Sequence, residues 1–559
     1  MSRASAGLSA AAARLRDEAA DLPLPLDLPG AGEARRTRTE LVSQLDDYVL
    51  PRLRHPEAPL LAVVGGSTGA GRSTLVNSLV GREVSPVGVL RPTTRVPVLV
   101  CRAADRRWFS GTRVLPGLRR AARPTRAAGE GPALVLRVDD RVPQGLAVLD
   151  IPDIDSVDGA NRALAVRLLG AADIWLFVTT AARYADAVPW RLLQVARERT
   201  AEIAVVLNRV PDGDLGEIRP HFEALLGGAG LGGVPLFALP ETTLVGRMLT
   251  RDQIAPVRAW LYDRAMHADT RETAVRRTLG GVLGSLPDRA DALGRAAGRQ
   301  HEAAGALAVC VDRAYAAARR YVDGALRGGS VLTGDVLAHW RAWVSAGLPE
   351  SGVPELEAAL VEGVESLFRD VAERAAGLTS TCWRGRPGGL ALVDDRTPGG
   401  ATGSGDVGAA GSEAGAEIDT TADPRAAAAR AAAEWRAEAV ARVAAGLPDG
   451  ASGRARAGVL LMTAALGYDA DTDTGAGGHS AGDTTDSDAS GGSEAATQAR
   501  AALSAALAAE MEPLRASVRG RAAQLLDAQR DVHMRTVRAL RTVPGDRLGA
   551  ATDAMRRAG

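Results

Sequence analysis

The sequence has no lysine and very few aromatic residues. All 67 of its lysine-or-arginine positions are arginine, and Phe, Trp and Tyr together make up 3% of the 559 residues. Because aromatic side chains bury the largest areas, cores with so few of them must consist of Ala, Leu and Val, which favours helices over much of the chain. The hydrophobic content of 46% still suffices for folded domains. A net charge of +0 excludes a global attraction to nucleic acid or anionic lipid.

Cysteines and long apolar runs are also scarce. The three cysteines, Cys101, Cys310 and Cys382, lie far apart and show neither a disulfide framework nor a metal-binding spacing. No apolar run approaches the roughly 18–20 residues that span a bilayer, and the N-terminal residues lack the apolar core of a signal peptide. The sequence therefore predicts a soluble protein of the reducing cytoplasm, attached to membranes at most peripherally.

Residues 59–79 (PLLAVVGGSTGAGRSTLVNSL) combine an apolar strand-like run, a glycine-rich loop and an amphipathic helix. From Gly66 the spacing is G-x-x-x-x-G followed by Arg72 and Ser73, which is the phosphate-binding P-loop with arginine in the lysine position. Its glycines let backbone N–H groups converge on a phosphate, the helix start adds positive charge, and the Ser73 hydroxyl suits Mg²⁺. We expect the nucleotide to contact Gly66, Ser67, Thr68, Gly69, Ala70, Gly71, Arg72, Ser73 and Thr74.

Apolar strand-like runs alternate with helical stretches from about residue 60 to residue 270. This alternation predicts an α/β domain with a mostly parallel sheet, helices on both faces, and ligands at the carboxyl ends of the strands. Beyond it, helical stripes such as that in residues 354–374 predict an α-helical bundle. We expect a flexible leader over 1–32, a P-loop domain over 33–270, a helical domain over 271–559, and disordered insertions rich in Gly, Ser, Thr and Asp at 395–424 and 470–497.

Further segments follow the P-loop in the order that a nucleotide hydrolase requires. The RPTTR segment offers Thr94 as a magnesium ligand when a γ-phosphate is present, and the apolar run LAVLD ends in Asp150, a carboxylate suited to holding Mg²⁺ through water. The run VVLN ends in Asn208, where a base would be read. We therefore assign phosphoryl transfer to Arg72, Thr94 and Asp150, the metal to Ser73, Thr94 and Asp150, and contacts to the base to Asn208 and Arg209.

With these motifs the chain resembles the dynamin-like and Era-like P-loop GTPases over about residues 55–265. The resemblance rests on GGSTGAGRSTLVNSL, RPTTR, LAVLDIPDIDSV, and IWLFVTTAARYADA followed by VVLNRV. A GTPase head followed by a long helical region is more similar to the bacterial dynamin-like proteins than to Era. The resemblance implies binding of GTP and GDP with Mg²⁺, hydrolysis of GTP, and a helical domain that moves with the nucleotide state.

Several positions depart from the family pattern. Arg72 stands where the family has lysine, and Asp153 replaces the glycine of D-x-P-G in the second switch. The base-reading motif N-K-x-D becomes NRVP at residues 208–211, and Ile154 stands at the position of the catalytic glutamine. Because a guanidinium fork is not a point charge and Ile154 replaces the catalytic residue, we expect slow hydrolysis and a homo- or hetero-dimer partner that helps to position water. Because NRVP lacks the carboxylate that would accept hydrogen bonds from guanine, we expect weak guanine selectivity.

Two alternatives to a GTPase stay open. The departures also support a second hypothesis, a pseudo-GTPase scaffold that binds nucleotide poorly and has little or no turnover. An ATP-dependent enzyme of the transporter or kinase type fits less well, because no glutamate follows Asp150 and no LSGGQ signature is present in the sequence.

Residues 102–126 are rich in arginine and include Trp108 and Phe109. A basic patch with exposed aromatic side chains would suit anionic lipid headgroups, RNA or an acidic partner. A solvated, arginine-rich insertion is the plainer interpretation. Since the sequence carries no further nucleic-acid motif, we do not expect it to bind nucleic acid.

Overall fold

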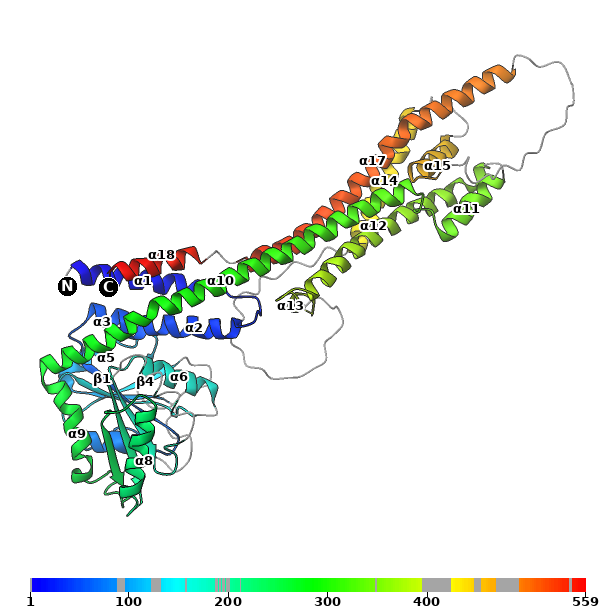
Figure 1. Cartoon of the computed structure of the whole chain (residues 1–559). Helices are drawn as coiled ribbons and strands as arrows, with labels where there is room; N and C mark the ends of the chain where they lie inside the picture. The colour runs from blue at the N-terminus through cyan, green and yellow to red at the C-terminus, as the bar shows by residue number, and fades with distance from the viewer. Residues whose placement is uncertain are drawn as a thin grey trace. The chain divides into compact units, whose positions relative to one another are not determined.

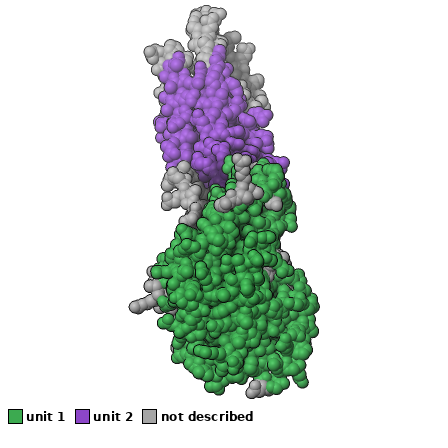
Figure 2. Space-filling view, turned by 90° about the vertical axis from the view of Figure 1, so that its left-hand side faces the viewer, with its two compact units in different colours: residues 1–24, 29–298, 543–559 green, residues 25–28, 299–542 purple. Residues whose placement is uncertain are grey.

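A computed structural model divides the chain into two compact units (Figure 2). Unit 1 comprises residues 1–24, 29–298 and 543–559, and unit 2 comprises residues 25–28 and 299–542. The structure describes residues 3–87, 96–121, 132–155, 158–185, 190, 193, 197, 202–211, 213–346, 349–394, 424–446, 454–468, 492–541 and 545–558.

Unit 1 contains an eight-stranded sheet with the strand order β3-β4-β2-β5-β1-β6-β7-β8 (Figure 1). The strands span Leu60–Gly66 (β1), Val98–Cys101 (β2), Arg119–Ala121 (β3), Ala133–Val138 (β4), Leu146–Asp150 (β5), Ile174–Thr180 (β6), Glu202–Val210 (β7) and Leu236–Pro240 (β8). Among these strands, β2 pairs antiparallel with β5 and the other pairs are parallel. The expected α/β fold with a mostly parallel sheet is confirmed.

The register of the strands brings the predicted site residues to one edge of the sheet. Val64 pairs with Asp150 across β1 and β5, and Thr180 pairs with Asn208 across β6 and β7. These strands run parallel, so Asp150 and Asn208 lie at the same edge as the loop that leaves β1.

Helices cover both faces of the sheet, as strands that are buried on two sides require. Successive residues of β1 point to opposite faces, so Leu60 and Ala62 join one core while Leu61 and Val63 join the other. The first core packs against α4 (Arg72–Val80) and α9 (Arg251–Met266). The second core packs against α5 (Arg106–Phe109), which follows η2 (Ala103–Asp105), and against α6 (Gly159–Gly170) and α8 (Leu215–Gly228).

The N-terminal residues form helices instead of the flexible leader that we expected for 1–32. These helices are α1 (Arg3–Ala20), α2 (Ala31–Gln44), the π-helical turn η1 (Leu45–Val49) and α3 (Leu50–Arg54). Leu15 of α1 is buried with Leu286 of helix α10 (Ala268–Arg327) and with Leu548 of α18 (Asp546–Ala558). Helix α18 lies next to α1 although it closes the sequence (Figure 1). The covering surface thus comes from the far end of the chain, which local patterns do not reveal.

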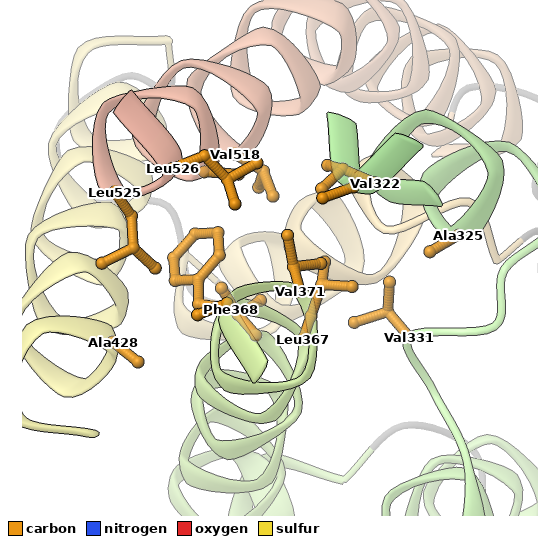
Figure 3. Packing of buried hydrophobic residues seen from close by; sticks show 14 of the residues in the cluster. Val322, Ala325, Val331, Leu367, Phe368, Val371, Ala428, Val518, Leu525 and Leu526 are labelled. Atoms are coloured by element: carbon orange, nitrogen blue, oxygen red, sulfur yellow. The ribbon is translucent and has the colours of Figure 1, made fainter. Parts of the chain in front are cut away.

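Unit 2 is helical, as expected for the region beyond the sheet. Its helices are the later part of α10 (Ala268–Arg327), α11 (Gly334–Ser345), η3 (Glu350–Gly352), α12 (Val353–Arg384), α13 (Leu390–Asp394), α14 (Pro424–Gly446), α15 (Arg454–Ala465) and α17 (Gly492–Leu540). Figure 3 shows Phe368 of α12 and Leu525 of α17 in the same apolar core, with Val322 of α10 nearby. The stripe in residues 354–374 is therefore core packing.

A disulfide joins Cys310 of α10 to Cys382 of α12, with 5.7 Å between their Cα atoms. This corrects the expectation drawn from cysteine spacing. The two residues are 72 positions apart in sequence and meet because their helices pack side by side in unit 2. Cys101 is buried and unbonded.

The disordered insertions expected at 395–424 and 470–497 lie almost wholly outside the described residues. Their described parts are Pro424, which begins α14, and residues 492–497, which begin α17. Within the part of the chain that the structure describes, no helix is both long enough and apolar enough to cross a membrane.

Candidate nucleotide-binding site

The glycine-rich loop connects β1 to α4 and is packed too tightly for side chains at two of its glycines. A Cβ atom on Gly66 would lie 2.0 Å from the Val178 carbonyl oxygen, and one on Gly71 would lie 2.4 Å from the Asn208 amide nitrogen. Gly71 also has φ of 92° and precedes the first residue of α4, a left-handed conformation that glycine adopts without strain. The loop therefore has the tight backbone turn that its glycine spacing predicts for a phosphate-binding loop.

Arg72 is the first residue of α4, and its guanidinium folds back into the protein. Its side chain is 6% exposed, donates to the carbonyl oxygens of Gly66 (2.6 Å) and Pro152 (3.2 Å), and forms an ion pair with Asp153. The arginine in the lysine position thus has its own carboxylate partner. That partner is the residue which replaces the family's glycine.

A second carboxylate, Asp155, binds the loop itself. Its Oδ1 accepts hydrogen bonds from the backbone nitrogen (2.8 Å) and the hydroxyl (2.6 Å) of Thr68. Arg183 lies 3.1 Å from its other oxygen and donates to the Thr68 carbonyl. Burial raises the pKa of Asp155, but the Thr68 hydrogen bonds and the Arg183 charge outweigh it, so the pKa is lowered. Neither Asp155 nor Arg183 was predicted as a site residue, because no motif assigns a role to either position.

Ser73 and Asp150, the predicted metal residues, are in contact. The Ser73 hydroxyl donates to Asp150 Oδ2 at 2.6 Å, and the Ser85 hydroxyl donates to the same oxygen at 2.5 Å. Burial raises the pKa of Asp150, against the lowering effects of Arg72, Ser73 and Ser85. Its Oδ1 is buried and has no hydrogen-bond partner among the described residues.

This donor set fits a magnesium ion. Mg²⁺ prefers oxygen ligands and is usually held by one or two carboxylates together with waters and substrate phosphates. The orphaned Asp150 oxygen beside the Ser73 hydroxyl provides such ligands. Thr94, the third predicted ligand, lies outside the described residues.

Ser85 was not predicted, and Asn77 of α4 explains its position. Asn77 is fully buried; its side-chain oxygen accepts from the backbone nitrogens of Val84 and Ser85, and its amide donates to the Ser85 carbonyl, each at 2.9 Å. Three hydrogen bonds to one short turn fix the Ser85 hydroxyl against Asp150.

Asn208, predicted to contact the base, lies at the P-loop. Its amide nitrogen donates to the Ala70 carbonyl at 2.8 Å, and its side-chain oxygen accepts from the backbone nitrogen of Arg209. Arg209 is exposed and has φ of 54°. In this arrangement Asn208 supports the loop, and its contact with a base stays a prediction.

The arginine-rich segment does not display its aromatic side chains. Trp108 and Phe109 are buried in the core on the second face of the sheet. The Arg120 guanidinium organises the segment by donating to backbone carbonyls of Phe109, Gly111, Val114, Leu115 and Leu118. The expectation of a basic patch with exposed aromatics is therefore wrong for its described part.

The segment that carries these motifs is similar to a known protein family. The family model of the dynamin family matches residues 61–210. One similar solved structure is an oligomerised bacterial dynamin pair, described as providing a mechanism for the long range sensing and tethering of membranes. Its sequence is 9% identical to this chain, and its TM-score is 0.29. The match covers 99% of this chain and 83% of that chain. A second structure of such a pair is 10% identical, with 69% and 76% covered and a TM-score of 0.28. No curated protein matches the sequence significantly. The segment that holds the P-loop, Asp150 and Asn208 is thus similar to the dynamin family over residues 61–210.

Proposed function

We propose that this protein binds GTP and GDP with Mg²⁺, hydrolyses GTP slowly, and couples its nucleotide state to the helices that surround the sheet. The observation that carries the proposal is the convergence at one sheet edge of the P-loop, the Ser73–Asp150 pair and Asn208. Phosphoryl transfer by such sites depends on positioning and charge neutralisation, with no covalent intermediate.

In this proposal the site residues bind the phosphates, the magnesium ion and the base. Backbone N–H groups of residues 66–73 cradle the phosphates, and Arg72 supplies positive charge once it is turned toward them. Ser73, Asp150 and Thr94 hold the magnesium ion, which when bound would neutralise phosphate charge. Asn208 keeps the loop in shape through its hydrogen bond to Ala70, and with Arg209 it faces the base.

A route from the site to the helices is present within unit 1. Helix α6 begins directly after the second-switch segment, with Asp158 as its N-cap. Arg167 of α6 forms a two-pronged ion pair with Asp47 in the π-helical turn η1 (2.5 and 3.0 Å). Because charge-paired forks hold a fixed geometry, a shift of α6 would be passed to the N-terminal helices.

The proposal includes a dimer partner that acts through the P-loop domain. Ile154, which stands at the position of the catalytic glutamine, is buried in the core. Its side chain has no group that could orient water, so a second copy or a related protein would supply one. Peripheral membrane contact and a cytoplasmic location stay predictions.

One observation favours a pseudo-GTPase scaffold as the second candidate. The cation that should meet the phosphates is already paired with Asp153. If that pair never opens, the domain binds nucleotide poorly and serves assembly alone.

Calorimetric titration of the full chain with GDP, a non-hydrolysable GTP analogue and ADP, each with Mg²⁺, tests the proposal. We expect micromolar binding of the guanine nucleotides and weaker binding of ADP. Absence of binding by all three would overturn nucleotide binding and leave the scaffold. Binding without phosphate release in a turnover assay would overturn only the hydrolysis.

A further inference from the structure

Two carboxylates of the segment that follows β5 bind the cation and the hydrogen-bond donors of P-loop residues. Asp153 pairs with the Arg72 guanidinium, and Asp155 accepts from both the backbone nitrogen and the hydroxyl of Thr68. A carboxylate that accepts from a loop N–H makes the same kind of bond as a phosphate oxygen. The Arg72 cation and the two donors of Thr68 are thus already bound by acidic groups of the same chain.

The place of these carboxylates relative to a nucleotide follows from the loop. The basic residue after the last P-loop glycine reaches the β- and γ-phosphates, and here that residue is Arg72. Its partner Asp153 therefore stands on the side of the loop where the terminal phosphate arrives. Asp155 is joined to the same segment and is held by Arg183 at 3.1 Å.

Charge determines which nucleotide this arrangement accepts. Arg72 and Arg183 carry positive charge, but each is matched by a carboxylate, Asp153 or Asp155. A γ-phosphate brought to this place meets two negative side chains in a poorly solvated site, where like charges repel strongly. A diphosphate ends before that place and still receives the loop N–H groups and the Ser73 hydroxyl.

We propose that Asp153 and Asp155 are specificity-determining residues that make this site select nucleoside diphosphates over triphosphates. The inference rests on the proposed function, since it assumes that the loop binds a nucleotide. It makes the diphosphate complex the favoured state of the domain.

The test compares Asp153→Asn and Asp155→Asn with the unmodified chain by calorimetric titration with GDP and with a non-hydrolysable GTP analogue, each with Mg²⁺. Asparagine preserves the shape and keeps one oxygen that can accept the hydrogen bonds made by Oδ1 of each carboxylate, while it removes the negative charge. We expect the unmodified chain to bind GDP at least about tenfold more tightly than the analogue, the factor that corresponds to one strong charge contact. Each variant should gain affinity for the analogue, so that this ratio falls toward one.

Asp140→Asn is the matched control. Asp140 follows β4 at the sheet edge away from the loop, is 66% exposed and lies 3.8 Å from Arg102. Its removal changes net charge by the same amount and should leave the GDP-to-analogue ratio unchanged. Thermal unfolding of each variant identifies any loss of fold. Asp155, at 14% exposure, is the safer position to change, because its partner Arg183 is more exposed than Arg72, the partner of Asp153.

The outcomes separate this inference from the proposed function. Equal or tighter binding of the triphosphate analogue by the unmodified chain overturns the selectivity and leaves nucleotide binding intact. Equal weakening of both ligands in the variants also overturns it, because the carboxylates would then only support the loop. Absence of binding by the chain and by both variants overturns the proposed function and the inference with it.

Discussion

The guanidinium of Arg72 is paired with the carboxylate of Asp153, and each of these residues departs from the family pattern at its own position. Singly, an arginine in the lysine position and an aspartate in place of glycine look like defects. Together they form a buried ion pair whose members compensate each other. Removing one member of such a pair leaves an uncompensated buried charge, which typically costs about 3–5 kcal/mol.

Asp153→Gly alone should therefore lower the free energy of unfolding of the nucleotide-free protein by about 3–5 kcal/mol. The double variant Arg72→Lys with Asp153→Gly carries the family's residues at both positions. Because its lysine would still lack a carboxylate partner, the nucleotide-free double variant should lose a similar amount of stability, but it should gain GTP turnover. Urea unfolding and phosphate release measure the two effects. A loss well below about 3 kcal/mol in Asp153→Gly would show that the pair does not stabilise the fold, and unchanged turnover in the double variant would favour the scaffold.

Asn208→Ala should weaken binding of every nucleotide by a similar factor. The Asn208 amide donates to the Ala70 carbonyl inside the loop, so its loss leaves a buried acceptor unsatisfied at a cost of about 1–3 kcal/mol. Titration with GDP and ADP checks this. A loss confined to guanine nucleotides would instead show that Asn208 reads the base.

The disulfide between Cys310 and Cys382 predicts a specific thiol count. The native protein should show no reactive thiol, the unfolded protein one, and the unfolded and reduced protein three. Burial, with a smaller effect of the Asp105 charge, raises the pKa of Cys101 to about 12, so this thiol stays unreactive in the native state. Two free thiols more than expected after unfolding without reductant would exclude the disulfide.

Reduction should also destabilise unit 2. Opening a link across 72 residues releases chain entropy in the unfolded state worth about 4 kcal/mol. Cys310→Ala with Cys382→Ala should show a similar loss in urea unfolding, and reductant should have no further effect on that variant.

Arg52→Met should be among the most destabilising substitutions in the N-terminal helices. Arg52 of α3 is buried, pairs with the fully buried Asp173 at the start of β6, and donates to the carbonyls of Ala58 and Pro59 at 2.8 Å. We expect a loss of about 3–5 kcal/mol in the free energy of unfolding. Arg54→Met, on the exposed side of the same helix, is the control and should change it by less than about 0.5 kcal/mol.

Asp155 should make stability fall in acid. Its pKa is lower in the folded protein than in the unfolded chain, where it is about 3.9. Its contribution is therefore complete above the unfolded pKa and is lost as the pH falls through the folded pKa. Urea unfolding between about pH 5 and pH 2 should show a shallower decline for Asp155→Asn than for the unmodified chain. Parallel profiles would contradict the lowered pKa.

The P-loop, the parallel sheet and the order of the site segments could be predicted from the sequence because their signals are local. Glycine spacing fixes a backbone turn, and apolar runs that alternate with amphipathic stretches indicate strands buried between helices. Asp150 and Asn208 could be placed beside the loop for the same reason, since parallel strands end at one edge.

The pairings across the chain were decided by the tertiary structure. Leu15 is buried against Leu548, Cys310 meets Cys382, and Asp155 reaches Thr68 only after the chain has folded. No period or motif links such positions, because contact between distant segments depends on how whole helices and strands pack. The sequence by itself determined that a phosphate-binding loop is present. The fold decided that Asp153 pairs with the cation of this loop and that Asp155 accepts from the Thr68 N–H, because packing brings the second-switch segment against the loop.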